Sequence, residues 1–358
     1  MVNSSKQKQY YYWVDNTKCI ACILVVLGHF WMSMVVSGIS KENVIYDFTI
    51  QSIYTFHVPL FFVCSGFLYQ KSNRVHTIKS WSKNVLYKLL NLGVPYFTFT
   101  LITFLMKAVF SNSVNNQNGN IIRTLFISPI APYWFLYALF FLFLVTPCMK
   151  TKKQAEVLLA VAFALKIANI VLSANNVSMP SIIKYILGML IWFAIGIFLA
   201  FDEIKLTSKI CKVIMVISAV CAFAICIFYY RTPKTNEPVK FIVGLLFVTA
   251  IIIASYNFQN DKLNNFCNKF SKYFMPIYVM HTIFAAGIRI ILLKLGITNI
   301  FNTVTTGMEL RGKEFAMLQS IGMTKREFDK MIRLESVFYG SKALIIGVVS
   351  GTLLSYVI

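Results

Sequence analysis

Long apolar runs alternate with short polar segments along most of this chain. Nine such runs lie before residue 296, and most approach the roughly 20 residues that a helix needs to cross the hydrocarbon core of a bilayer. A tenth run follows a mixed-charge segment. The ten runs lie at about 19–36, 50–69, 89–110, 133–146, 155–172, 182–200, 213–230, 241–256, 273–295 and 343–358. The pattern predicts an all-α polytopic membrane protein, a bundle of about ten transmembrane helices.

The composition agrees with a membrane protein and changes how the charge is interpreted. The chain is 58% hydrophobic and 13% charged, with a mean hydropathy of +0.68, which is outside the range of soluble domains. Its net charge is +21, from 34 Lys and Arg against 13 Asp and Glu. In a soluble protein that excess would suggest nucleic acid. Here the basic residues stand between apolar runs, so we predict contact with membrane lipids and no nucleic-acid partner.

The basic residues also predict an orientation. They gather in the N-terminal segment and after the even-numbered runs, most densely from Lys71 to Lys88. Loops rich in Lys and Arg stay on the cytoplasmic side of a membrane. We therefore predict a multi-pass protein with a cytoplasmic N-terminus.

Eight cysteines lie mostly inside the apolar runs. Cys19 and Cys22 form a C-x-x-C pair, but no second pair follows and no histidine stands at zinc-finger spacing. We interpret them as buried thiols and predict no metal site.

Three polar residues, two at the polar entrance of the first run and one inside it, share one helical stripe. Lys18 and His29 are eleven positions apart, which brings both side chains within roughly 20° of each other and roughly 16 Å apart along a helix. Asp15 lies on the same stripe. If the run spans a bilayer, His29 lies near its middle, where an ionisable group suggests function by default. A lone histidine can also be a packing residue that hydrogen-bonds between helices.

Further ionisable residues inside the runs favour the functional interpretation. His57 precedes Pro59 in the second run, and His281 lies in the ninth run with Arg289 eight residues further along. Such residues usually face a bundle interior or a watery cavity. Three intramembrane histidines and an arginine are hard to explain by packing alone.

Four short motifs occur in an order that resembles a known family. They are K-x10-H in the first run, F-H-V-P-L-F-F-V-C-S-G-F in the second, Y-W-F-L in the fourth and I-Y-V-M-H in the ninth. Over about residues 10–295 the chain resembles the membrane-bound acyltransferase-3 family, the O-acetyltransferases of bacterial surface sugars. The resemblance implies a plasma-membrane enzyme that moves an acyl group, typically acetyl, from acetyl-CoA or another acyl-CoA to a hydroxyl of a surface or lipid-linked glycan. It implies no permanently bound cofactor.

The resemblance also implies roles for individual residues. The family's Arg/Lys-x10-His motif falls on Lys18 and His29, with Lys18 positioning the donor or Asp15. His29 would act in its neutral form as a general base, or would carry the acyl group covalently.

Other residues would bind the substrates. The family's Arg-x-x-Arg motif corresponds to Lys71 and Arg74, where Lys replaces an Arg and cannot make the same bidentate contact with a donor phosphate. His57, His281 and Arg289 would line the cavity.

After residue 297 the sequence is no longer one long apolar run, because it mixes basic, acidic and apolar residues. The run R-G-K-E-F-A-M-L-Q-S-I-G-M-T is similar to the C-terminal part of FtsX-like ABC-transporter permeases. We predict two domains, an acyltransferase-3-like membrane domain at 1–297 and a permease-like fragment at 298–358. Gly347 and Gly351 in the last run form G-x-x-x-G, a helix-packing pattern that can also be simply small residues in a span.

This second part leaves two alternatives open. The chain could instead be a permease-like transporter subunit, or an inactive remnant in which two unrelated parts are joined. Nine spans put residues 298–338 outside, yet their basic residues favour the inside. A topology reporter placed after Lys330 decides the side, and a cytoplasmic signal there would weaken the enzyme interpretation.

Overall fold

The computed structural model describes residues 10–72, 75, 77–110, 120–201, 208–230 and 236–294, and seven positions between 324 and 334. The chain divides into two compact units. Met1–Met32 and Glu42–Ile283 form the first unit, and Ser33–Lys41 and Phe284–Ile358 form the second.

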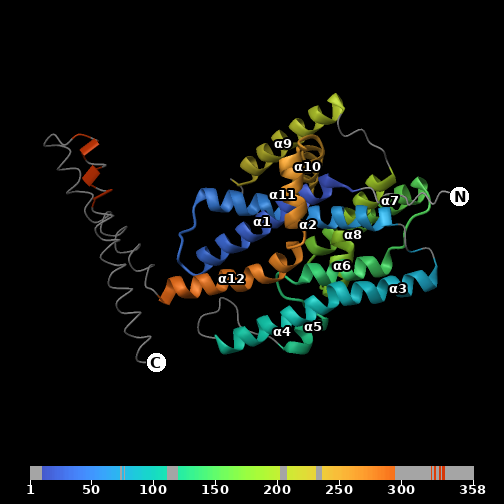
Figure 1. Ribbon diagram of the computed structural model, residues 1–358, viewed down its shortest axis with the longest axis horizontal. Helices are drawn as coiled ribbons and strands as arrows, with labels where there is room; N and C mark the ends of the chain where they lie inside the picture. Colours follow the sequence, from blue (N-terminus) through green and yellow to red (C-terminus); the bar gives the residue numbers. More distant parts are fainter. Residues whose placement is uncertain are drawn as a thin grey trace. The chain divides into compact units, whose positions relative to one another are not determined.

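The described part of the chain is helical, as predicted. Its helices, in chain order (Figure 1), are α1 (Tyr12–Val36), α2 (Val44–Ser72), α3 (Ile78–Lys88), the π-helical turn η1 (Leu89–Gly93), α4 (Val94–Val109), α5 (Ile121–Phe126), α6 (Trp134–Val145), α7 (Lys152–Ala174), α8 (Ser181–Phe201), α9 (Lys209–Tyr230), α10 (Glu237–Asn257), α11 (Asp261–Ser271) and α12 (Phe274–Lys294).

Each of the first nine predicted runs falls on one of these helices. Among the described residues, eight helices are long and apolar enough to cross a membrane, with α3, η1 and α4 continuing as one helix from Ile78 to Val109. This confirms an all-α, multi-pass membrane protein. The tenth run and Gly347 and Gly351 lie outside the described residues.

The third helix begins earlier than its apolar run. The run starts at Leu89, but the helix starts at Ile78, because Thr77 and Ser80 form a reciprocal capping box at its first turn. The polar turns between Ile78 and Lys88 extend the helix beyond its apolar part, and hydropathy alone does not detect them.

Helix α6 is the shortest helix that matches one of the apolar runs. Its 12 residues span roughly 18 Å, well under the roughly 30 Å hydrocarbon core. Irregular backbone flanks it on both sides, and side chains donate to carbonyls in and beside these segments. Tyr137 donates to Phe126 O at 2.7 Å, and Tyr69 donates to Thr146 O at 2.7 Å. Non-helical backbone at membrane depth is tolerated where such partners are present.

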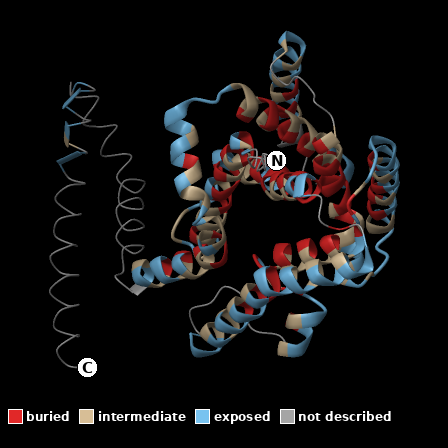
Figure 2. Cartoon of the chain, turned by 45° about the vertical axis from the view of Figure 1, so that its right-hand side comes forward, coloured by how far each residue is buried: buried red, intermediate tan, exposed pale blue. Residues whose placement is uncertain are grey.

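Helix α2 is the most buried of the candidate spans. It packs against α8 and α10 at positions where a glycine on one helix meets the backbone of the other. A Cβ added to Gly196 on α8 would lie 2.0 Å from Val63 O, and one added to Gly244 on α10 would lie 2.7 Å from Thr55 O. Small residues let membrane helices approach this closely. Buried positions accordingly line the inward faces of the helices, with exposed ones outside (Figure 2).

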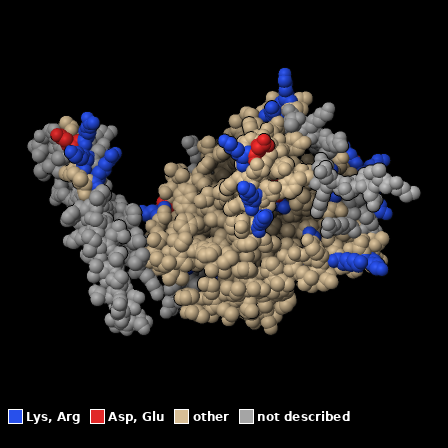
Figure 3. Space-filling model, in the orientation of Figure 1, with Lys and Arg blue, Asp and Glu red and all other residues tan. Residues whose placement is uncertain are grey.

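Charged side chains are scarce on much of the molecule. A broad part of the face in Figure 3 carries neither Lys, Arg, Asp nor Glu. Helix α9 instead exposes apolar side chains, and Val213, Ile217 and Val220 are each more than half exposed. Apolar side chains exposed along a long helix suit contact with lipid.

We predict that Gly196→Ala destabilises the protein by roughly 1–3 kcal/mol, because the new methyl group overlaps the α2 backbone and has no rotamer to relieve the overlap. The measurement is the midpoint of thermal unfolding in detergent. Gly287→Ala is the matched control, since a Cβ there meets nothing within 4 Å. Equal midpoints for the two variants would contradict the close α2–α8 contact.

Candidate active site in the bilayer

Three histidines from three helices meet in the first unit. His29 comes from α1, His57 from α2 and His281 from α12. The ring centroids of His29 and His281 are 5.0 Å apart. Tyr54 of α2 joins the other two, with centroid distances of 5.7 Å to His29 and 4.8 Å to His57. The structure therefore brings together all three histidines that the sequence singled out.

Two of these rings have a defined tautomer. His57 Nδ1 lies 2.7 Å from Ile53 O, and His281 Nδ1 lies 2.7 Å from Tyr278 O. A carbonyl oxygen only accepts, so each Nδ1 must carry the hydrogen. In the neutral ring, Nε2 then keeps its lone pair and can accept a proton.

The remaining ring contacts are looser. Tyr54 Oη lies 3.3 Å from His29 Nδ1, where either group can donate. Among the described residues, the buried Nε2 of His281 has no hydrogen-bond partner. Gly28 gives Tyr54 its place, because a Cβ on Gly28 would lie 3.2 Å from the tyrosine ring. The cluster thus holds a phenol and three imidazoles whose neighbouring ring centroids are 4.8–5.7 Å apart.

A cavity of about 350 Å³ adjoins this cluster. His29, Tyr54 and His57 line it. Its remaining lining is mostly aromatic or apolar, and its charged lining residues are Lys166 of α7 with Glu237 and Lys240 of α10. Glu237 and Lys240 form an ion pair at 2.8 Å. Aromatic walls with a few polar groups are typical of small-molecule sites.

The polar start of α1 packs against α11. Tyr10 donates to the Asp15 carboxylate, and Asn16 Nδ2 donates to Asn264 Oδ1 at 2.9 Å. Burial and the hydrogen bond to Asp15 raise the pKa of the Tyr10 phenol well above its usual range, which keeps it a donor. Lys18 is half-buried, and no carboxylate of the described residues lies within ion-pair distance of it.

The other predicted site residues are not part of the histidine cluster. Lys71 lies over the rings of Tyr11 and Phe67, with 5.7 Å from Nζ to each centroid. Arg74 lies outside the described residues. In the second unit, Arg289 is buried and donates to Ser33 Oγ at 3.2 Å.

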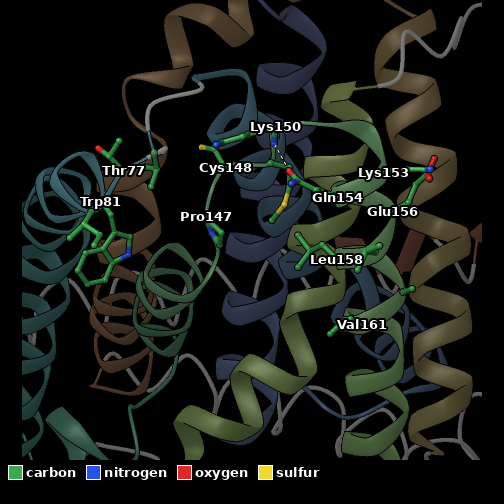
Figure 4. Close-up of a pocket in the computed structure, with 15 residues that line it drawn as sticks. Thr77, Trp81, Pro147, Cys148, Lys150, Lys153, Gln154, Glu156, Leu158 and Val161 are labelled. Carbon is green, nitrogen blue, oxygen red and sulfur yellow. Dashed lines mark hydrogen bonds between the residues drawn. The ribbon is translucent and has the colours of Figure 1, made fainter.

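A second hollow opens beside α3 and α7. This groove of about 1200 Å³ is lined by Trp81 on one side and Lys150 and Gln154 across from it, with Leu158 and Val161 deeper down (Figure 4). Gln154 Oε1 accepts from the Lys150 backbone N–H at 2.8 Å. Within the described residues, no three His, Cys, Asp or Glu side chains are arranged to hold a metal ion.

Sequence reasoning missed Tyr54, Lys166, Glu237 and Lys240, which all line the cavity. Tyr54 lies three positions before His57, so both fall on one face of a helix, and that spacing was a usable signal. Lys166 is a charge inside the fifth apolar run, which is a signal of the same kind as His29. The tertiary contacts of Glu237 and Lys240 had no such signal.

The helices and the buried ionisable cluster define a multi-pass membrane protein with a candidate reaction site inside the bilayer. A family model described as an acyltransferase domain matches residues 11–308. The chain therefore belongs to the membrane-bound acyltransferase-3 family, as its motifs predicted. A second model, the FtsX-like permease C-terminal region, matches residues 286–358 and bears out the similarity of the tail.

One curated relative gives a partial match. Nodulation protein NolL of Mesorhizobium japonicum is 27% identical over 184 residues, which are 51% of this chain and 48% of that protein. The chain thus aligns with about half the length of that relative. No solved structure matches significantly.

We predict that Tyr54→Phe changes the ring-nitrogen signals of His29, because it removes the only hydroxyl that contacts His29 Nδ1 among the described residues. The measurement is solid-state NMR of protein labelled with ¹⁵N-histidine in bilayers. His57 and His281 should keep their Nδ1–H signals. Tyr12→Phe, at an exposed position of α1, is the control. Unchanged His29 signals in Tyr54→Phe would contradict the contact.

Proposed function

We propose that this protein is an O-acyltransferase of the bacterial plasma membrane. It moves an acyl group, typically acetyl, from a CoA thioester on the cytoplasmic side to a hydroxyl of a surface or lipid-linked glycan. The observation that carries the proposal is the cluster of His29, Tyr54 and His57 at an aromatic-lined cavity inside the helix bundle. The N-terminus is cytoplasmic, which the basic residues support.

The chemistry follows from the neutral imidazoles. His29 takes the proton of the acceptor hydroxyl while the oxygen attacks the thioester carbonyl. A carbon–oxygen bond forms, the carbon–sulfur bond breaks, and the CoA thiolate leaves with a proton from the imidazolium. In the alternative route, His29 first carries the acyl group and then passes it to the hydroxyl. The nearby His281 and His57 support proton exchange in either route.

The two substrates enter from opposite ends. The cavity has lining residues at the first turns of α6 and α10, Trp134 and Glu237. If consecutive spans alternate in direction, both turns lie on the side opposite to the start of α1. The acceptor then enters the cavity from outside the cell.

The CoA donor approaches from the cytoplasmic end. Lys18 is half-buried on the helix that carries His29 and would guide the thioester arm. Lys71, Arg74 and the groove beside Lys150 supply cations for the phosphates. Arg289 remains a candidate contact for the substrates within the second unit.

The second candidate function is that of a permease-like subunit, which the match at 286–358 favours. The histidine cluster argues against a permease-like subunit, because His29, His57 and His281 all precede the permease-like match and lie within the acyltransferase match. We propose a domain boundary near residue 297, inside the stretch 286–308 where the two family matches overlap. An inactive remnant is the third alternative, and activity of the whole chain excludes it.

We predict that His29→Ala lowers the rate of acyl transfer by roughly 10²–10⁴-fold, which is the usual contribution of a positioned general base. The assay follows labelled acetyl from acetyl-CoA into glycan in membranes that contain the full chain. His76→Ala, in the Lys/Arg-rich sequence between the second and third apolar runs, is the control and should keep its activity. Transfer by His29→Ala at the wild-type rate would overturn the proposed role. A truncation after Leu295 tests whether the tail is needed.

A further inference from the structure

A lysine lies where a membrane helix rarely tolerates one. Lys166 is ten residues after Glu156 and eight before the end of α7, so it is deep within this span. Its side chain is buried, with 8% exposed. A charge at such a depth is costly, and it is retained where it faces a cavity and serves a substrate or an ion.

Lys166 has an aromatic neighbour and forms no ion pair with the described residues. Nζ lies 5.4 Å from the ring centroid of Phe241, and no carboxylate of the described residues lies within ion-pair distance. Glu237, the acidic lining residue of the cavity, attracts Lys166 electrostatically but forms its ion pair with Lys240. One turn beyond Lys166, the buried Oδ1 of Asn169 also has no hydrogen-bond partner among the described residues.

The cavity lining is therefore net positive. Its charged residues are Lys166, Lys240 and Glu237, and the ion pair between the last two cancels. A net charge of one cation remains beside walls that include Trp134 and Trp192. Aromatic faces suit the apolar faces of a sugar ring, and a desolvated ammonium suits an anion.

We propose that Lys166 is a specificity-determining residue that binds an acidic group on the acceptor. The acceptor is then a sugar that carries a carboxylate or a phosphate near the hydroxyl that is acylated. This inference rests on the proposed function, because it takes the cavity to be the acceptor site. A neutral sugar would leave the buried ammonium without a partner, and the cavity would discriminate against it.

Binding can be tested without turnover, because Trp134 and Trp192 line the cavity and report on its occupancy by fluorescence. The full chain in lipid nanodiscs is titrated with octyl glucoside, octyl glucuronide and octyl glucoside 6-phosphate. These probes differ only in the group at one sugar carbon. We expect at least one acidic probe to bind roughly ten-fold or more tightly than the neutral one, as for a charge-assisted hydrogen bond.

Three variants assign that preference to Lys166. Lys166→Met should remove it by weakening the acidic probe alone, and Lys166→Arg should retain it. Lys184→Met is the matched control, because Lys184 is exposed on α8 and does not line the cavity. Equal binding of all three probes, or a preference that survives in Lys166→Met, overturns the inference. A purely structural cation–π contact with Phe241 predicts that second result, together with reduced stability.

The transfer assay separates this inference from the proposed function. If His29→Ala abolishes acetyl transfer while no probe preference exists, the enzyme proposal stands and the acidic-acceptor inference falls. If Lys166 selects an acidic probe but no form transfers acetyl, the anion site stands and the enzyme proposal falls.

Discussion

The need to satisfy the backbone polar groups without water governs this structure. In a bilayer, an unpaired carbonyl or N–H costs several kcal/mol, which is why the spans are helical. Where the chain leaves the helical path beside α6, tyrosine hydroxyls take over the role of water. Tyr137, Tyr69 and Tyr278 each donate to a backbone carbonyl in or beside that stretch. A short, irregular segment can therefore lie within the bundle and border the cavity.

The same constraint fixes the tautomer of two histidines. His57 and His281 each donate from Nδ1 to a carbonyl of their own helix, three or four residues back. That bond satisfies one ring nitrogen and leaves Nε2 basic in the neutral ring. A structural hydrogen bond thus selects the tautomer that can accept a proton. Gly196 and Gly244 let α8 and α10 approach the backbone of α2 closely. These contacts hold in place the helix that carries Tyr54 and His57.

Polar side chains are partnered differently at the start of α1 and in the cavity. Near the start of α1, polar side chains bind one another across α1 and α11, as Asn16 and Asn264 do. In the cavity, by contrast, Lys166 is buried without a carboxylate partner among the described residues. Replacing that lysine with an apolar residue would remove the cost of a buried charge, so stability alone does not account for it. The separate match to FtsX-like permeases begins at residue 286 and includes none of these residues.

The sequence by itself determined the class of protein, because apolar runs and Lys/Arg-rich loops are local features that hydropathy and charge report directly. It also singled out His29, His57 and His281, since an ionisable residue stands out in an apolar run. Only the tertiary structure decided that these three meet, that Tyr54 joins them and that Lys166 lines the cavity near them. Those relations join residues up to 252 positions apart, from His29 to His281. They depend on how helices pack, which no local pattern encodes.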